Sequence, residues 1–420
     1  MRKIVCFDPP YSHYFNDLTL SIEKCLGQRL EKECVTFNSA NKLYLPNFSL
    51  FKPKLGKSSD KDLYRYDFVT KIPSLSNVNG EVTCSELARK HIEVYISIEK
   101  YIKNNLNAIY LIYNDLRWNH AFAIDILKKN NCTFFVFERG VFRPYSTTMD
   151  TIGVNANSKL RNTRVTEICS EKSETLDRVF FKNRVERTVK FNFVKYFIAS
   201  KFAAALQPKS VKAVAKSRYR KNLKDYVKLQ FSSSKVKSKN QNDIKLDLAD
   251  ITYVFVPLQL SNDTQTLINS DFSSTQEFIN KIVEDFRASK LYGEAELVFK
   301  QHPLDTSLYN FPNDVLVSSL PTEQLIEHCE FCITINSTVG FEALFKKRVL
   351  CLGRSFYTEH GFVGYVDKHM NAIDANFEQR CAKNYKYFVL DNYQVPGSIF
   401  NYTGEDLEYT ANKILTLSNI

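Results

Sequence analysis

Two carboxylates in this chain stand where glycosyl chemistry could use them. Glu138 follows the apolar run 133–137, and Asp263 comes shortly after the run 251–258. A pair of carboxylates can flank one reacting sugar carbon, one as acid/base and the other as nucleophile or stabiliser. Each also has a plainer interpretation. Glu138 can form an ion pair with arginine in a turn, and Asp263 can cap a turn or a helix.

Groups suited to holding a phosphate follow two other runs. His302 ends the run 296–301, where a protonated imidazole could neutralise charge on a departing phosphate. Residues 336–340, Asn-Ser-Thr-Val-Gly, open a helix-periodic stretch, and the amides and hydroxyls of a helix start can bind an anion. The alternatives are a loop histidine bonded to backbone and a simple helix cap, with Gly340 present for close packing.

Arg143 and the absence of several known motifs narrow the kinds of site that the sequence allows. Arg143 can grip a carboxylate or phosphate through two hydrogen bonds. No Walker loop and no Gly-x-Gly-x-x-Gly motif occurs, so an ATPase or dinucleotide enzyme is disfavoured. No Asp-x-Asp pair follows a strand, and Cys329 with Cys332 forms the only Cys-x-x-Cys pair, so we expect neither a catalytic metal nor zinc. We expect the ten cysteines to be reduced thiols.

The elements that must position these groups alternate between strand and helix. Strands are expected at 3–7, 34–38, 108–113, 133–137, 251–258, 296–301, 331–335 and 349–353, and helices at 117–131, 273–290, 321–329 and 339–347. This βαβ pattern predicts parallel sheets, which bind ligands outside the carboxyl ends of their strands. Polar residues follow nearly every strand, including Asp8 and Asn114. Taken singly each favours the plainer interpretation; taken together they favour a site.

Length and charge suggest how the chain is divided. It has 420 residues, 44% apolar and 25% charged, with a net charge of +11. Residues 181–240 hold 17 Lys/Arg against 2 Asp/Glu, so this segment carries the whole excess. We predict a Rossmann-like domain at 1–170, a basic helical linker at 171–248, a second Rossmann-like domain at 249–375 and a C-terminal helical or irregular segment at 376–420.

The basic segment has three interpretations. A run of charge is most often a solvated face, and nucleic acid is conceivable, although no nucleic-acid module is evident. Anionic lipid is the better candidate, because aromatic and aliphatic residues alternate with Lys and Arg between 189 and 228. No signal peptide and no run of 18 apolar residues is present. We therefore expect a cytoplasmic protein that binds a membrane surface peripherally.

Four stretches together resemble the bacterial capsule polysaccharide synthesis family. They are FERGVFRPYSTTMDTIGVNANS (137–158), LQLSNDTQ (258–265), FKQHPLD (299–305) and CITINSTVGFEALFKKRVLCLGRSFY (332–357). The resemblance is to the KpsS/LipB-like type that builds the β-Kdo lipid linker of group 2 capsules. It implies an α/β, GT-B-like fold with two Rossmann-like domains facing a central cleft, joined by the basic helical segment. The first domain would lie on the acceptor side and the second would bind the nucleotide sugar. The family's lipid acceptor also implies a place on the inner face of the cytoplasmic membrane.

The resemblance also implies roles for individual residues. Asp263 corresponds to the proposed nucleophile and Glu138 to the acid/base, with His302 beside the departing phosphate. The expected substrate-binding residues are Arg143, Gln259, Asn262, Lys300, Asn336, Ser337, Thr338, Gly340 and Glu342. Of these, Asn336, Ser337 and Thr338 correspond to the nucleotide-phosphate site and Glu342 to a ribose or base contact. Arg139 and Leu260 depart from the family pattern, which could alter acceptor choice.

The implied activity is a retaining, metal-independent glycosyltransferase that moves Kdo from CMP-β-Kdo to phosphatidylglycerol and so starts the capsule linker. No cofactor besides this donor is expected. Expected partners are the sugar nucleotide, an anionic glycerophospholipid, the membrane surface, a second capsule Kdo transferase and the capsule export complex, and no nucleic acid. Two alternatives stay open. One is an enzyme of the same fold that uses another sugar nucleotide or extends an existing Kdo chain, and the other is a non-catalytic capsule-assembly protein.

Overall fold

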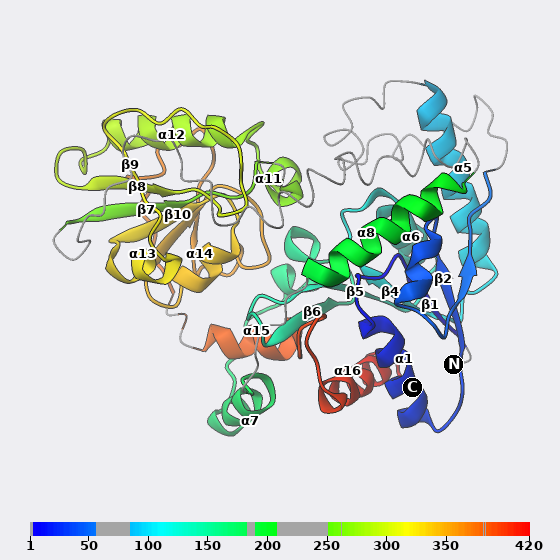
Figure 1. Cartoon of the computed structure of the whole chain (residues 1–420). Helices are drawn as coiled ribbons and strands as arrows, with labels where there is room; N and C mark the ends of the chain where they lie inside the picture. Colours follow the sequence, from blue (N-terminus) through cyan, green and yellow to red (C-terminus); the bar gives the residue numbers. More distant parts are fainter. Residues whose placement is uncertain are drawn as a thin grey trace. The chain divides into compact units, whose positions relative to one another are not determined.

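The computed structural model describes residues 3–55, 85–182, 190–207, 251–261, 263–380, 382 and 384–420. The chain divides into two compact units (Figure 1). Unit 1 comprises residues 1–154, 168–227 and 387–420, and unit 2 comprises 155–167 and 228–386. Three parts of the sequence prediction lie outside the described residues: Asn262 and, in the basic segment, residues 183–189 and 208–248.

Unit 1 is built on a seven-stranded sheet in the order β13-β6-β5-β4-β1-β2-β3. Its strands are β1 Lys3–Phe7, β2 Glu31–Val35, β3 Ser49–Phe51, β4 Ile109–Tyr113, β5 Phe134–Arg139, β6 Ser146–Asp150 and β13 Gln394–Pro396. Strands β1 to β5 pair in parallel, whereas β6 and β13 are antiparallel additions. In chain order the first six strands are arranged 3-2-1-4-5-6, which is the Rossmann order.

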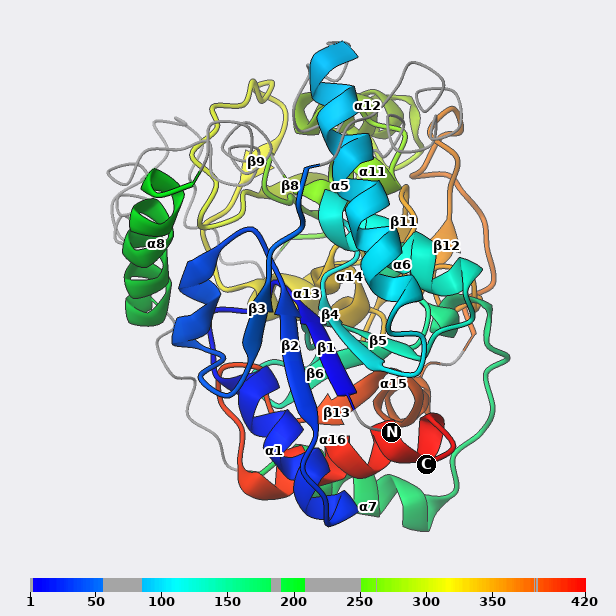
Figure 2. The same cartoon turned by 90° about the vertical axis from the view of Figure 1, so that its right-hand side faces the viewer.

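Helices cover both faces of this sheet (Figure 2). Unit 1 contains α1 Tyr14–Leu26, η1 Ser39–Leu43, α5 Ser85–Lys103, α6 Trp118–Lys129, α7 Ser170–Phe180, α8 Lys190–Ala205 and α16 Gly404–Leu417. On β1, Val5 and Phe7 pack against α5 and α6, whereas Ile4 and Cys6 pack against α1 and α16. Because both faces are buried, the strand is apolar from Ile4 to Phe7.

Unit 2 is built on a six-stranded parallel sheet in the order β12-β11-β10-β7-β8-β9. Its strands are β7 Tyr253–Pro257, β8 Glu296–Lys300, β9 Leu316–Val317, β10 Phe331–Thr334, β11 Arg348–Cys351 and β12 Gly364–Tyr365. Its helices are η2 Asn155–Asn157, η3 Lys159–Asn162, α11 Thr264–Asn269, α12 Thr275–Ala288, α13 Thr322–His328 and α14 Thr338–Ala343. The strand order is again 3-2-1-4-5-6 in chain order. Helix α15, Tyr385–Tyr393, spans the boundary between the units.

Side-chain caps fix where several of these helices begin. Ser274 accepts a hydrogen bond from the backbone N–H of Glu277 at 3.1 Å and so starts α12, which lies within the predicted helix 273–290. Thr403 and Asp406 form a reciprocal capping box that starts α16. At the other end of a helix, Gly27 closes α1 with a φ of 65°, a conformation that suits glycine.

The prediction of an α/β fold with two Rossmann-like units is confirmed. The eight predicted strands are present, although β2 begins at Glu31 rather than at residue 34. The strands β3, β6, β9, β12 and β13 were not anticipated. The predicted boundaries and the central cleft stay predictions. The structure adds that residues 387–420 belong to unit 1, where α16 packs on α1.

Candidate functional site

The strand order gives each unit a switch point, between β1 and β4 in unit 1 and between β7 and β10 in unit 2. On either side of such a point the chain crosses over in opposite directions. Ligands of open parallel sheets bind there, beyond the carboxyl ends of the strands. The side chains that follow these strands are therefore the first candidates for a binding site.

Asp8 follows β1 and centres a buried polar network in unit 1. Its carboxylate accepts hydrogen bonds from the Thr36 hydroxyl and from the side-chain amides of Asn41 and Asn119, the last two at 2.8 Å. Its backbone carbonyl accepts one from Arg117 Nη1 at 3.3 Å. Because Asp8 is only 4% exposed, these donors are needed to satisfy its charge. Asp8 thereby ties the ends of β1 and β2 to the start of α6.

Glu138, the predicted acid/base, lies near the end of β5 and is partly buried. Its Oε1 accepts from the backbone N–H of Arg139 at 3.2 Å, and its Oε2 accepts from the side-chain amide of Asn114. Asn114 has a left-handed φ of 69°, and its Oδ1 accepts from the N–H of Leu116 at 2.8 Å. That second bond turns the amide nitrogen of Asn114 toward Glu138. The structure thus brings the side chains that end β4 and β5 together.

Burial is the largest influence on the Glu138 carboxyl, and it raises the pKa above the usual 4.5. The two hydrogen bonds and the positive charges of Arg117 and Arg143 lower the pKa, but they do not outweigh burial. A carboxyl group with a raised pKa keeps its proton closer to neutral pH. That property suits a general acid in glycosyl chemistry.

Gly140, which belongs to the stretch 137–158 that resembles the family, lies in the turn between β5 and β6. A Cβ at Gly140 would lie 2.0 Å from the carbonyl oxygen of Ser146, so only glycine fits. Arg143 has an exposed side chain whose Nε donates to the Gly140 carbonyl at 3.2 Å. The motif therefore shapes this turn, and substrate binding by Arg143 stays a prediction.

Gln259 and Asn336 meet across the switch point of unit 2. Gln259 Nε2 donates to Asn336 Oδ1 at 3.0 Å, and Gln259 Oε1 accepts from the Asn336 backbone N–H at 3.3 Å. Asn336 Nδ2 also donates to the carbonyls of Gln265 at 3.0 Å and Arg354 at 3.2 Å. Both side chains are buried. The structure thus joins two predicted binding residues, whose amides tie the loops after β7 and β10 to α11.

The start of α14 has the features of a helix cap. Ser337 is its N-cap, with Oγ accepting a backbone N–H of the first turn at 3.2 Å. A Cβ at Gly340 would lie 2.7 Å from Thr334 Cγ2 and 2.8 Å from Tyr357 Oη, so the glycine lets α14 pack closely on the sheet. Tyr357 also donates to the Ser337 carbonyl at 2.6 Å. These are the plainer roles considered for this motif; anion binding there stays a prediction.

Asp263 and His302 lie on neighbouring loops of unit 2. Asp263 is the N-cap of α11, and its Oδ1 accepts from the backbone N–H of Gln265 at 2.9 Å. His302 Nδ1 accepts from the backbone N–H of Leu304 at 3.1 Å. This bond places the proton of the neutral imidazole on Nε2. The backbone-bonded histidine and the capping aspartate considered from the sequence are therefore both present, and their catalytic roles stay predictions.

Three further predicted binding residues, Lys300, Thr338 and Glu342, lie on β8 and α14. Lys300, the last residue of β8, donates its ammonium to the backbone carbonyl of Leu320. Thr338 is the first residue of α14, and Glu342 lies on the exposed side of that helix. Contact of these residues with a nucleotide stays a prediction.

Asp305 was missed as a site residue, although it ends the stretch FKQHPLD. It is 6% exposed and accepts hydrogen bonds from Tyr309 Oη at 2.6 Å, Ser307 N at 3.1 Å and both the N–H and the hydroxyl of Ser261 at 3.3 Å. Asp305 thereby binds the loop of His302 to the loop that leads to Asp263. The signal was the Asp-x-Ser pattern, which is typical of a turn closed by a side chain.

The predicted residues therefore form two sets, one in each unit. Unit 1 holds Glu138 and Arg143, and unit 2 holds the others, apart from Asn262, which lies outside the described residues. The pairing of Glu138 with Asp263 around one sugar stays a prediction. Within the described residues no three His, Cys, Asp or Glu side chains gather to hold a metal ion; metal independence also stays a prediction.

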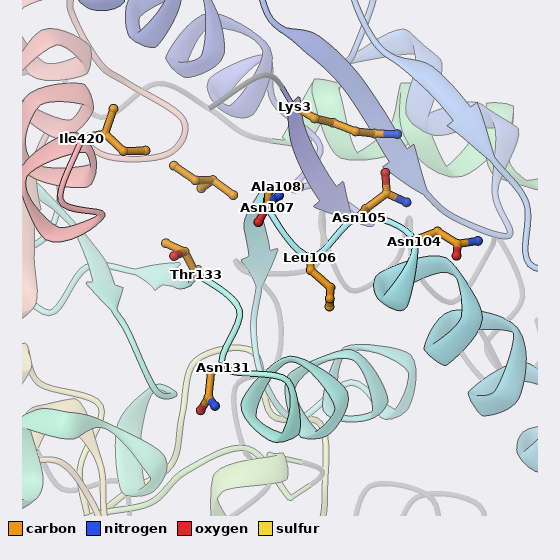
Figure 3. A pocket seen from close by; sticks show the side chains of 10 residues that line it. Lys3, Asn104, Asn105, Leu106, Asn107, Ala108, Asn131, Thr133 and Ile420 are labelled. Carbon is orange, nitrogen blue, oxygen red and sulfur yellow. The ribbon is translucent and has the colours of Figure 1, made fainter.

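A hollow of about 760 Å³ lies at the opposite edge of the unit 1 sheet (Figure 3). Lys3, Ile109 and Thr133 at or near the starts of β1, β4 and β5 line it, together with Asn104–Asn107, Asn131 and Ile420. It contains none of the predicted site residues. Because ligands of parallel sheets bind beyond the carboxyl ends, we do not assign this hollow to the site.

Comparison with known proteins adds the following. A family described as "Capsule polysaccharide biosynthesis protein" matches residues 110–390. The capsule polysaccharide modification protein LipB of Neisseria meningitidis is 26% identical over 288 residues, 62% of this chain and 67% of LipB. The capsule polysaccharide export protein KpsS of Escherichia coli is 25% identical over 313 residues, 68% of this chain and 77% of KpsS. The solved structure of Thermosulfurimonas dismutans KpsC, a beta Kdo 2,7 transferase, is 14% identical with a TM-score of 0.38, covering 93% of this chain and 99% of KpsC.

Proposed function

This chain belongs to the family of capsule polysaccharide biosynthesis proteins, and on that premise we propose that it is a capsule glycosyltransferase. In its specific form, the proposal is transfer of β-Kdo from CMP-Kdo to phosphatidylglycerol with retention of configuration, which starts the capsular lipid linker. The relatives are named for modification or export of capsule polysaccharide, which supports the capsule part of the proposal. The donor and acceptor rest on the motif resemblance.

The observation that carries the proposal is the setting of Glu138. It stands at the carboxyl edge of a Rossmann sheet, next to the switch-point residue Asn114, and burial raises its pKa. A general acid that protonates a leaving oxygen, or a base that takes a proton from an acceptor hydroxyl, needs such a tuned carboxyl group. We assign Glu138 this acid/base role.

Asp263 is the proposed nucleophile. Its Oδ1 is held by the N–H of Gln265, while among the described residues no hydrogen-bond partner is recorded for Oδ2. One anchored oxygen fixes the carboxylate plane, and the second oxygen would attack the anomeric carbon of Kdo. CMP then departs, and the acceptor hydroxyl displaces Asp263 in a second step, which retains the configuration.

The remaining residues of unit 2 would hold the nucleotide. His302 would donate from Nε2 to the departing phosphate, and the start of α14 at Ser337 and Thr338 would add hydroxyl and amide donors. Gln259 and Asn336 would hold these loops in place through their mutual hydrogen bonds. The proposal requires no metal ion, because the positive charge comes from protein groups.

The first test is a transfer assay with the purified full-length protein. CMP-Kdo, generated in situ, is incubated with fluorescent phosphatidylglycerol, and the product mass is measured. A gain of one Kdo supports donor, acceptor and priming role together. A product only with acceptors that already carry Kdo would favour chain extension, and no product with any Kdo acceptor would point to another donor or to a non-catalytic protein.

Site variants complete this test. Glu138→Gln and Asp263→Asn are each expected to lower the transfer rate by about 10²–10⁴-fold while circular dichroism stays unchanged. The control is Glu296→Gln, at the exposed amino end of β8 and far along the strand from its carboxyl edge, which should transfer like the unchanged protein. Full transfer by both site variants would contradict the catalytic assignment.

A further inference from the structure

Helix α8 is apolar on two sides, and within the described residues only one of these sides is buried. Tyr196, Phe197 and Ser200 are buried, whereas Phe191 is 78% exposed, Phe202 70% and Leu206 88%. A soluble surface helix normally shows polar residues on its outer face. Large exposed apolar groups gathered on one side of a helix therefore call for a partner.

Polar contacts fix which side of α8 faces out. Tyr196 Oη donates to Asn41 Oδ1 at 2.6 Å, and Asn38 Nδ2 donates to Ser200 Oγ at 2.8 Å. Tyr44 Oη also donates to the Asn192 carbonyl at 2.9 Å. A rotation of the helix that buried its outer phenylalanines would break these bonds. The outward orientation is therefore held by specific contacts rather than by weak packing.

The outer face combines aromatic, aliphatic and basic groups. Phe191, Ile198, Phe202 and Leu206 follow one another at helical spacing, and the exposed Lys195 and Lys201 lie among them. The helix contains no Asp or Glu, and within the described residues neither lysine forms an ion pair. Figures 1 and 2 show α8, in green, along the outside of unit 1. We call the four apolar and two basic side chains the α8 face.

We propose that the α8 face docks onto an anionic phospholipid membrane surface. Phenylalanine and leucine side chains enter the boundary between headgroups and acyl chains, while the lysines pair with anionic headgroups. Charge favours this occupant, because every charged side chain of the face is basic and the surrounding segment 181–240 holds 17 Lys/Arg against 2 Asp/Glu. A second copy of the same chain would instead set like charges against each other.

The docked membrane would lie close to the candidate site of unit 1. Asn41 Oδ1 accepts a hydrogen bond from the Tyr196 hydroxyl, and Asn41 Nδ2 donates one to the Asp8 carboxylate at 2.8 Å. Asp8 follows β1 at the switch point, so three side chains connect the membrane helix to the carboxyl edge of the sheet. A membrane bound at α8 would thus present its headgroups on the side of the proposed acceptor domain. No helix in the described part of the chain is long and apolar enough to cross a membrane.

Vesicle sedimentation with the full-length protein tests the proposal without any sugar donor, so its failure is separate from a failure of the proposed function. The protein should sediment with phosphatidylcholine vesicles that contain phosphatidylglycerol, and much less with phosphatidylcholine alone. The variant Phe191→Ser/Phe202→Ser/Leu206→Ser should bind these vesicles at least about tenfold more weakly, because it loses three inserting side chains. Lys195→Glu/Lys201→Glu should also bind more weakly, most clearly at low salt.

The matched control is Leu308→Ser, which removes a leucine that is 93% exposed in unit 2 and should leave vesicle binding unchanged. Insertion is tested directly by Phe202→Trp, whose added fluorescence should shift to the blue on anionic vesicles, whereas that of Leu308→Trp should not. Equal binding by the triple variant and the unchanged protein would overturn the proposal, as would no binding to anionic vesicles. A dimer in sedimentation velocity that the triple variant abolishes would assign the face to a second copy instead.

Discussion

At the scale of single residues, Glu138 shows how a strand end can tune a carboxyl group. Its two oxygens accept hydrogen bonds from Arg139 and Asn114, which favour the ionised form, yet burial favours the neutral form more strongly. The sequence could suggest the residue but not this balance. The balance depends on Asn114, which reaches Glu138 from the neighbouring strand only after the sheet has formed.

The raised pKa of Glu138 predicts a pH-dependent stability. The neutral buried form stabilises unit 1 fully below about pH 4.5, and this contribution is lost as pH rises through the folded pKa. Glu138→Gln stays neutral, so its free energy of unfolding should increase relative to the unchanged protein as pH rises above about 4.5. Urea unfolding followed by fluorescence of Trp118, the single tryptophan and a residue of unit 1, measures this difference. A difference that stays constant between pH 4 and pH 8 would contradict the assignment.

Substitution of Gly340 tests whether this glycine is needed for the close packing of α14 on the sheet. Gly340→Ala should lower the free energy of unfolding by about 1–3 kcal/mol, because the new methyl would crowd Thr334 and Tyr357. Gly404→Ala, at the start of α16, meets no atom within 4 Å and should change it by less than about 1 kcal/mol. Urea unfolding followed by circular dichroism measures both. Equal stability of the two variants would show that the packing around Gly340 can yield.

At the scale of elements, the loops after β7 and β8 behave as one structure. Asp305 accepts hydrogen bonds from Ser261 on one loop and from Ser307 and Tyr309 on the other. A single buried carboxylate thereby connects the segments that carry Asp263 and His302. We therefore expect Asp305 to help position both proposed catalytic groups, Asp263 and His302.

Asp305→Ala is expected to loosen both loops without unfolding unit 2. Removal of the carboxylate leaves buried donors unsatisfied, which costs about 1–3 kcal/mol locally. Hydrogen–deuterium exchange should become faster at the amides of Ser261 and Ser307, whose N–H groups lose their acceptor. Asp367→Ala, in an exposed turn of the same unit where it accepts from His369, should leave exchange at Ser261 unchanged. Unchanged protection of Ser261 in Asp305→Ala would refute the coupling.

At the scale of the whole molecule, the chain returns at its end to the unit in which it began. β13 pairs with β6, and α16 packs on α1 with Ile414 fully buried in the same core as β1. Unit 1 therefore needs residues that lie more than 250 positions apart in the sequence. Its core thus contains side chains from both ends of the chain.

This arrangement predicts that Ile414→Ala destabilises unit 1. Loss of a buried isoleucine side chain should lower the free energy of unfolding by about 2–5 kcal/mol. Because Trp118 lies in unit 1, its fluorescence reports this transition even though the substitution is almost three hundred residues away. Leu417→Ala, at a site that is 48% exposed on the same helix, should change it by about 0.5 kcal/mol or less. An unchanged Trp118 transition in Ile414→Ala would place α16 outside the cooperative unit.

The sequence predicted strands best where they are buried on both faces. β1, β4 and β7 read as unbroken apolar runs, because helices cover both sides of the sheet. β6 was missed because its residues, Ser146–Asp150, are mostly polar although all are buried. Thr147, for example, donates to the Gly397 carbonyl at 2.7 Å, a partner that no local pattern reveals.

The sequence by itself determined the α/β class, the two Rossmann-like units, the family and the positions of candidate residues at strand ends, because these follow from hydrophobic periodicity and short motifs. Only the tertiary structure decided which of those residues meet. Gln259 bonds Asn336, Asn114 bonds Glu138, and Asp305 joins two loops, each across a gap in sequence that a strand order of 3-2-1-4-5-6 closes. The physical reason is that these hydrogen bonds form at the carboxyl edge of each sheet, where strand pairing brings distant residues together. Strand pairing depends on many segments of the chain at once, so no single segment reveals it.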